Sequence, residues 1–195
     1  MKLERLFRGL AEVFDAPMQI EQTARAALLD AADVATYEGP AVPLRQPFLD
    51  VMHRSDAHQV CELIMETQFD WAPPQTSQDP LYVSHSHPKA HVELLGPDGI
   101  IPSKKVRLGL YGILPNAEYG VRTHKAEEVF IMLAGEALWK RGDRPYEMHG
   151  PGERSHHPSM LPHATKTGTS AFMSVYTWVG DLSTESYDYK GIPTD

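Results

Sequence analysis

The sequence predicts a mainly β protein with a helical region at its N-terminus. The apolar spacing is helical before residue 80, and afterwards short alternating runs are separated by turn residues at regular intervals. Several short strands in this arrangement are typical of a β-sandwich or barrel. A length of 195 residues suits one domain with an appendage. We therefore expect a helical region over residues 1–78 that packs on a β-barrel with a C-terminal tail, residues 79–195.

Three helical segments are expected in the first region. Apolar residues at i, i+3 and i+4 predict an amphipathic helix over residues 2–15. A run rich in alanine and leucine predicts a second helix over residues 19–35, broken by Gly39-Pro40. The third segment covers residues 47–69 and is closed by Pro73-Pro74.

The strands expected after residue 80 share short apolar runs that end at turn residues. They are residues 92–95, 106–114, 128–133, 137–140, 159–161 and 170–178. From residue 183 the sequence predicts a polar tail that packs across the barrel.

Composition excludes several classes of partner. The net charge of −8, without a basic cluster, argues against nucleic acid. No stretch approaches the ~18 apolar residues of a membrane span, and the first residues do not resemble a signal peptide. Cys61 is the only cysteine, which excludes an internal disulfide and suits a reducing compartment. We expect a cytoplasmic protein in which Cys61 is a buried, inert thiol.

The most informative stretch is residues 119–135. Interpreted as one strand, it places His124 and Glu128 on the same face, together with Arg122 and Phe130, because side chains alternate. An imidazole and a carboxylate that point the same way are candidate ligands for one metal ion.

A third candidate ligand, His163, lies 35 residues after Glu128, beyond a proline-bounded turn. Two imidazoles and one carboxylate with an open fourth position form the layout of a catalytic divalent-metal site. This ligand set suits Zn, Fe, Mn or Ni, and the sequence does not choose among them.

These residues resemble two motifs of the cupin superfamily. The first motif is matched by Gly120, His124, Glu128 and Gly135, and the second by Pro158 and His163. More narrowly, the chain resembles the cupin-type dimethylsulfoniopropionate lyases. That narrower resemblance rests on Tyr119 before the first two ligands, on the late histidine and on the closing run at residues 176–184. It implies a cupin jelly-roll β-barrel that binds one divalent metal and a small anionic or zwitterionic substrate, and that releases dimethyl sulfide and acrylate by base-promoted β-elimination.

Two positions depart from the lyase pattern. Arg122 replaces the first histidine of the usual pair, and Phe130 replaces a tyrosine that lies at the metal in the lyases. Three metal ligands are retained, but one hydroxyl of the lyase chemistry is missing. The sequence is therefore also compatible with a different small carboxylate as the substrate. Two alternatives also stay open: a cupin isomerase or dioxygenase of a small acid or sugar, and a non-catalytic ligand-binding cupin. Cupins often pair through sheet edges, so a homodimer is expected.

Tyr119 and Arg122 are the candidate catalytic residues. In the lyase hypothesis the metal holds the substrate carboxylate, Tyr119 removes the α-proton, and the neutral sulfide leaves. The metal and Arg122 would lower the pKa of the phenol. Arg122 can also grip a carboxylate with its two-pronged guanidinium. The alternatives are a half-buried tyrosine at a strand end and a structural ion pair between Arg122 and Glu118.

Four aromatic residues are predicted to line the substrate pocket: Phe130, Trp139, Tyr176 and Trp178. An aromatic wall suits a sulfonium or quaternary ammonium group through cation–π attraction. The alternative is that these rings belong to the barrel core.

Two further groups of histidines stay open. His156 and His157 flank the second motif, and either could orient a metal ligand or lie on the surface. His85, His87 and His91 have the spacing of a second metal pair, without a matching carboxylate.

Overall fold

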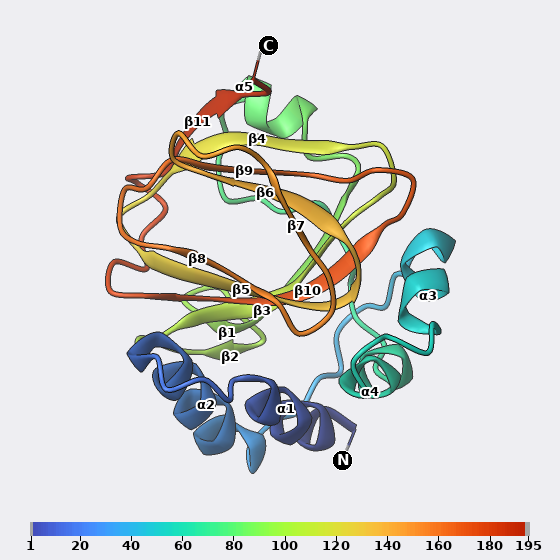
Figure 1. The fold of residues 1–195 in the computed structure, drawn as a ribbon. Helices are drawn as coiled ribbons and strands as arrows, with labels where there is room; N and C mark the ends of the chain where they lie inside the picture. Colours follow the sequence, from blue (N-terminus) through green and yellow to red (C-terminus); the bar gives the residue numbers. More distant parts are fainter. Residues whose placement is uncertain (1, 194–195) are drawn as a thin grey trace.

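The computed structural model of the protein describes residues 2–193 and shows two β-sheets packed face to face, with the helices of the first 70 residues outside one sheet and a short later helix beside the other (Figure 1). The outer bounds of the predicted division, residues 1 and 195, lie outside this range. The helices are α1 (Lys2–Val13), α2 (Gln19–Ala32), α3 (Gln46–Met52), α4 (Val60–Glu66) and α5 (Pro80–Ser84). The strands are β1 (Lys89–Gly96), β2 (Ile101–Pro102), β3 (Arg107–Ile113), β4 (Glu118–Thr123), β5 (Glu127–Gly135), β6 (Ala137–Arg141), β7 (Glu147–His149), β8 (Arg154–His157), β9 (His163–Lys166), β10 (Phe172–Val179) and β11 (Asp188–Gly191).

The strands form a six-stranded sheet with the order β2-β1-β3-β10-β5-β8 and a five-stranded sheet with the order β11-β4-β9-β6-β7. All named pairings are antiparallel except the short parallel pair of β1 and β2. The prediction of a mainly β protein with N-terminal helices is confirmed.

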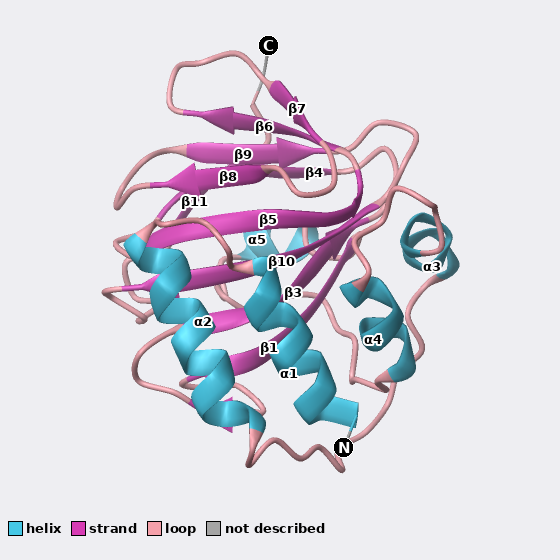
Figure 2. Cartoon of the chain, turned by 60° about the horizontal axis from the view of Figure 1, so that its bottom comes forward, coloured by secondary structure: helices cyan, strands magenta, loops and turns pink. Residues whose placement is uncertain are grey.

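Strand β5 shows how the sequence builds two separate cores. Its residues Val129, Ile131 and Leu133 pack with the helices, whereas Phe130 and Met132 point between the two sheets. This alternation is the period of two that a strand buried on both faces requires. Figure 2 shows α1 and α2 lying across the outer face of the six-stranded sheet. The interior between the sheets is therefore left for aromatic and polar side chains.

The helices differ from the prediction in their ends and in their number, and α1 already ends at Val13. Helix α2 ends at Ala32, and the third predicted segment is divided into α3 and α4 by residues 53–59. Ser55 and Asp56 in that link belong to the residue types that favour turns over helix interiors. Helix α5 was not predicted. Its N-cap, Asp79, accepts hydrogen bonds from two backbone amides of the first turn.

The helical layer is attached to the barrel by a buried ion pair. Glu21 of α2 is fully buried, and Arg154 of β8 donates hydrogen bonds to its two carboxylate oxygens at 2.7 and 3.2 Å. Pairing is what makes a buried carboxylate tolerable. Cys61 of α4 is also buried here, and burial raises the pKa of its thiol to about 12. The expectation of an inert thiol is therefore met.

The stretch 119–135 is not one strand, which corrects the prediction. Strand β4 ends at Thr123 in the five-stranded sheet, and β5 begins at Glu127 in the six-stranded sheet. The predicted strand over residues 159–161 is also wrong. Met160 there has a positive φ of 63°, and its amide donates a hydrogen bond to the carbonyl of His124 at 2.8 Å.

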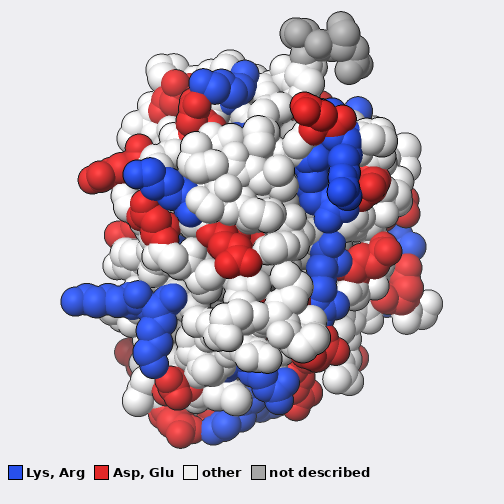
Figure 3. Space-filling model, turned by 60° about the vertical axis from the view of Figure 1, so that its left-hand side comes forward, with Lys and Arg blue, Asp and Glu red and all other residues white. Residues whose placement is uncertain are grey.

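The C-terminal residues contain strand β11, which pairs with β4. A side chain at Gly120 would place its Cβ 2.2 Å from the carbonyl oxygen of Gly191, so this close pairing requires glycine. In the described part of the chain, no helix has the length and apolar character to span a bilayer. On the face shown in Figure 3, acidic and basic side chains lie next to one another.

Candidate metal centre and substrate cavity

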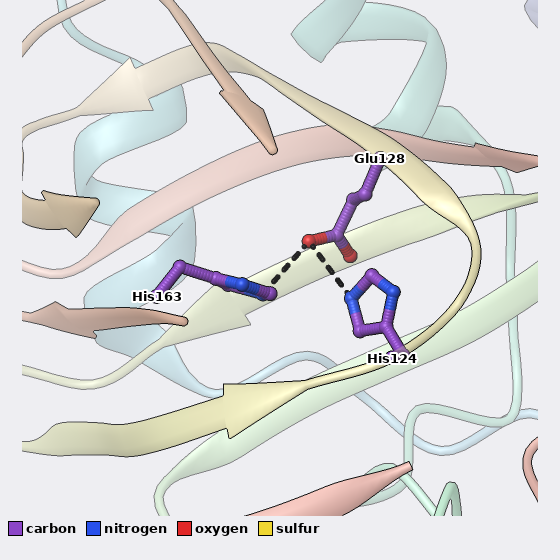
Figure 4. Close-up of side chains that lie close together, drawn as sticks. All are labelled: His124, Glu128 and His163. Carbon is purple, nitrogen blue, oxygen red and sulfur yellow. Dashed lines mark ion pairs between the residues drawn. The ribbon is translucent and has the colours of Figure 1, made fainter. Parts of the chain in front are cut away.

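Three buried side chains from different elements meet inside the barrel: His124, Glu128 and His163 (Figure 4). His124 lies in the turn after β4, Glu128 begins the inward face of β5, and His163 starts β9. The Nε2 atoms of His124 and His163 lie 3.5 and 3.1 Å from Oε2 of Glu128. Potential ligand atoms of all three residues lie within 4.8 Å of one another.

The second nitrogen of each imidazole fixes the tautomer. Nδ1 of His124 lies 3.1 Å from the carbonyl of Ala126, and Nδ1 of His163 lies 2.8 Å from the carbonyl of Leu161. A carbonyl only accepts, so each Nδ1 carries a proton, and in the neutral form of the ring each Nε2 presents a lone pair. Burial lowers the pKa of His163 well below its usual range, which keeps this imidazole neutral.

This arrangement fits a divalent cation. The two Nε2 atoms are buried and make no hydrogen bond with the described residues, although both face a carboxylate oxygen. Lone pairs that face one another in a buried site are unfavourable unless a cation lies between them. Two neutral imidazoles and one carboxylate suit Zn, Fe, Mn or Ni.

Glu128 is oriented by two further side chains. Nε1 of Trp178 donates a hydrogen bond to its Oε1 at 2.6 Å, and Nδ1 of His157 donates one to its Oε2 at 2.8 Å. Burial raises the pKa of Glu128, but the charge of His124 when its ring is protonated, together with hydrogen bonds from the neighbouring histidines, outweighs burial and holds the pKa well below its usual range. The Trp178 ring also stacks on His124 at 4.2 Å between centroids. Trp178 therefore positions two of the three candidate ligands.

His157 and His156 have different roles. His157 is fully buried, burial lowers its pKa to about 4, and its Nε2 accepts a hydrogen bond from Ser155 at 2.8 Å. It is a neutral residue whose hydrogen bond orients the candidate ligand Glu128. His156 points the other way and contacts Glu127 at 2.8 Å. Side chains alternate along β8, so His156 and His157 point to opposite faces. No strand was predicted over these residues, so the sequence analysis left their roles open.

A cavity of about 490 Å³ opens beside the candidate metal centre. Its buried part is lined by Glu128, Arg122 and aromatic rings, and its mouth by exposed residues that include Gln75 and Asp98. The rings are Tyr111, Tyr119, Phe130, Tyr176 and Trp178, with Tyr187 of the loop before β11. Among the predicted pocket residues, the structure places Phe130, Tyr176 and Trp178 on this wall. Trp139 is not on it: its ring lies against Phe130 at 4.7 Å between centroids, within the barrel core.

Arg122 is a buried cation without a carboxylate partner among the described residues. Its side chain is 2% exposed, its Nη2 makes no hydrogen bond, and its guanidinium lies 3.8 Å from the centre of the Tyr119 ring. The alternative ion pair with Glu118 is not formed, because Glu118 accepts a hydrogen bond from Tyr146 instead. A buried charge of this kind is expensive unless an anion enters the cavity.

Tyr119 is almost fully buried and its hydroxyl is hydrogen-bonded to that of Tyr187. Burial raises the pKa of the Tyr119 phenol well above its usual range, and the nearby charge of Arg122 acts in the opposite direction. Burial therefore outweighs the lowering of the Tyr119 pKa that was expected from Arg122.

The earlier histidines do not form a second cluster of three ligands in the described residues. Nδ1 of His85 lies 2.8 Å from the hydroxyl of Tyr189, whereas Nε2 of His91 lies 2.7 Å from the hydroxyl of Tyr176. His91 lines the cavity, and His87 does not. Sequence reasoning also missed Tyr111 and Tyr187 as cavity residues. Only Tyr111 lay in a predicted strand, where alternation offered a signal.

A two-sheeted barrel with an inward-facing cluster of two histidines and a glutamate defines a cupin with a candidate metal site. The chain belongs to the dimethylsulfoniopropionate lyase family, whose model matches residues 17–174. It is 36% identical over 91 residues to the dimethylsulfoniopropionate lyase DddQ of Ruegeria pomeroyi, which covers 47% of this chain and 45% of that protein. It is 33% identical over 93 residues to the putative dimethylsulfoniopropionate lyase DddL of Cereibacter sphaeroides, which covers 47% of this chain and 38% of that protein.

The matches thus span less than half the length of these two relatives. The crystal structure of DddQ from Ruegeria pomeroyi superposes with a TM-score of 0.65 at 23% identity, covering 100% of this chain and 98% of that one. This likeness confirms the cupin fold along the whole chain. The resemblance inferred from the motifs is confirmed at the level of the family.

Proposed function

We propose that the protein is a metal-dependent cupin lyase that acts on a small carboxylate with a cationic leaving group at its β-carbon. Dimethylsulfoniopropionate is the first candidate substrate. One observation carries this proposal: the cavity that reaches Glu128 of the His-Glu-His cluster also holds Arg122, a buried cation without an anionic partner among the described residues. Membership of the lyase family supports it.

The cavity offers a complementary group for each end of such a substrate. The Arg122 guanidinium suits the carboxylate, and the aromatic wall suits the sulfonium through cation–π attraction. His124, Glu128 and His163 would hold one divalent ion. When bound, it supplies Lewis-acid polarisation of the substrate's oxygen atoms. The donor set is equally consistent with Zn, Fe, Mn and Ni.

The reaction we propose is a β-elimination. A tyrosine phenolate takes the α-proton, the electron pair of that C–H bond forms the new double bond, and the C–S bond breaks with its electron pair on sulfur. Acrylate and neutral dimethyl sulfide result. Tyr119 is the candidate base, because it lines the cavity and its ring lies against the Arg122 guanidinium.

Acrylate and dimethyl sulfide formation by the metal-loaded protein tests this function, with Phe130→Tyr assayed in parallel. We expect measurable elimination by the wild-type protein. We also expect a rise of about tenfold in kcat for Phe130→Tyr, because this change adds a hydroxyl to the cavity wall. If neither protein eliminates sulfide, the lyase proposal is wrong. A non-catalytic ligand-binding cupin, or an isomerase or dioxygenase of a small acid, would then be preferred.

Replacing Arg122 with methionine should weaken substrate binding. Methionine keeps much of the side-chain volume but removes the cation that we assign to the carboxylate. We expect KM to rise about 10- to 100-fold, the usual cost of losing a charge-assisted hydrogen bond.

The control for this variant is Arg54→Met, at a surface arginine that pairs with Asp56 between α3 and α4. Acrylate binding to metal-free protein, followed by calorimetry, gives a second measurement that is independent of turnover. Unchanged KM and unchanged acrylate binding in Arg122→Met would rule out the carboxylate role.

A further inference from the structure

Two tyrosine hydroxyls in the cavity wall are hydrogen-bonded directly to each other. Tyr119 comes from β4 and Tyr187 from the loop between β10 and β11. Both residues line the cavity that also reaches Glu128. Phe130, on the same wall, lacks a hydroxyl of its own.

The loop that carries Tyr187 is attached beside a candidate metal ligand. The backbone amide of Lys125, the residue after His124, donates a hydrogen bond to Oγ of Ser186 at 3.2 Å. The Tyr187 amide bonds to the carbonyl of Thr184 at 3.1 Å. The Tyr187 ring lies parallel to the imidazole of His124, 6.1 Å away between centroids and 7° from coplanar. Its hydroxyl is therefore held at a defined position near the candidate metal centre.

The Arg122 guanidinium and the buried amine of Lys89 lie close to the ring of Tyr119. The Arg122 guanidinium is 3.8 Å and Nζ of Lys89 is 3.7 Å from the ring centroid. A positive group over an aromatic face, here the Arg122 guanidinium, stabilises negative charge in that ring more than it stabilises the neutral phenol. A second phenol that donates a hydrogen bond to the phenolate oxygen adds to this effect. The Arg122 charge and the hydrogen bond between the two hydroxyls thus act against burial, which raises the pKa of both phenols, and stabilise one negative charge shared by the two oxygens.

We propose that Tyr119 and Tyr187 act as one proton-accepting pair in the elimination, with Tyr187 supplying a second hydroxyl that Phe130 does not provide. This inference rests on the proposed lyase function. One phenolate takes the α-proton and becomes a phenol, while the other hydroxyl donates to the phenolate oxygen before the transfer. The electron pair of the C–H bond forms the double bond, and the sulfide leaves with the electrons of the C–S bond. The new phenol then gives its proton to water through the cavity mouth, which restores the phenolate.

A double-mutant cycle tests the pair. Tyr119→Phe, Tyr187→Phe and the double variant are compared by kcat and KM for dimethylsulfoniopropionate. We expect each single variant to lose about 100-fold or more in kcat, and the double variant to lose little beyond either one, because residues that act as a unit are strongly non-additive. Losses that multiply would show two independent roles and overturn the inference. Wild-type kcat in Tyr187→Phe would also overturn it.

A second measurement separates the pair from the lyase function. In D2O, uptake of deuterium at the α-carbon of 3-(trimethylammonio)propionate reports proton removal from a carboxylate with a poorer leaving group. If the wild-type protein exchanges this proton but forms no acrylate from dimethylsulfoniopropionate, the lyase proposal fails. The double-mutant cycle of Tyr119 and Tyr187 is then measured by the rate of deuterium exchange. If the wild-type protein neither eliminates nor exchanges, both fail.

Tyr146→Phe is the matched control, because its hydroxyl donates to Glu118 and it is not among the residues that line the cavity. It should keep wild-type rates. The Tyr187→Phe protein must also retain its metal content and melting temperature, because a loss of either, together with the loss of rate, would indicate a structural role and would overturn the inference.

Discussion

Replacing His163 with alanine should remove the metal from the protein. We expect about one divalent ion per chain in the wild-type protein and less than about 0.1 in the variant, because two remaining ligands do not hold a divalent ion against water. Elimination activity should fall below detection. The measurement is elemental analysis of protein purified without a histidine tag.

His156→Ala is the matched control for this variant. His156 lies seven positions earlier, is only partly buried, and contacts Glu127 instead of the cluster. It should keep a full metal content. Added metal should also raise the melting temperature of the wild-type protein and of this control but not of His163→Ala, because a ligand that binds only the folded state stabilises it. Retention of the metal by His163→Ala would contradict the assignment of the three ligands.

Replacing Lys89 with methionine should stabilise the protein strongly at neutral pH. Lys89 is 1% exposed, and its ammonium group has no hydrogen-bond partner among the described residues. Burial, with a smaller contribution from the charge of Arg122, lowers the pKa of Lys89 to about 6. The folded protein therefore holds this amine neutral at pH 7, whereas the unfolded chain protonates it. At ~1.4 kcal/mol per pH unit, we expect the free energy of unfolding to rise by about 2–4 kcal/mol at pH 7 in Lys89→Met.

The pH dependence has a definite sign. A lysine whose pKa is lowered on folding leaves more protons on the unfolded chain between pH 6 and about 10, so its cost to stability shrinks as the pH rises through that window. Urea unfolding at pH 7 and pH 9.5 should show the advantage of Lys89→Met decreasing toward the higher pH. Lys104→Met, at an exposed lysine, should show no such dependence. Equal stability of the wild-type protein and Lys89→Met at pH 7 would contradict the prediction.

The candidate ligands were predictable because they belong to two short motifs, the first with His124 and Glu128 and the second with His163. His124, Glu128 and His163 were chosen by residue type and order, and the structure brings them together. The reason given for the first two was wrong, because alternation along one strand does not join them. The chain passes from one sheet to the other between Thr123 and Glu127, and the two side chains meet across that turn. Sequence spacing alone does not distinguish a strand from a strand–turn–strand.

By itself, the sequence determined the mainly β class, the N-terminal helices, the buried thiol and the identity of the candidate ligands. These features depend on local periodicity and on residue chemistry, which can be recognised from the order of residues in the chain. Only the tertiary structure decided that Tyr187 meets Tyr119, that Arg122 lacks an anionic partner among the described residues, that His157 orients Glu128, and that Trp139 lies in the core. Each of these results depends on which strands become neighbours across the barrel. Contacts between residues far apart in the chain follow from sheet order and register, and these are set by packing of the whole fold.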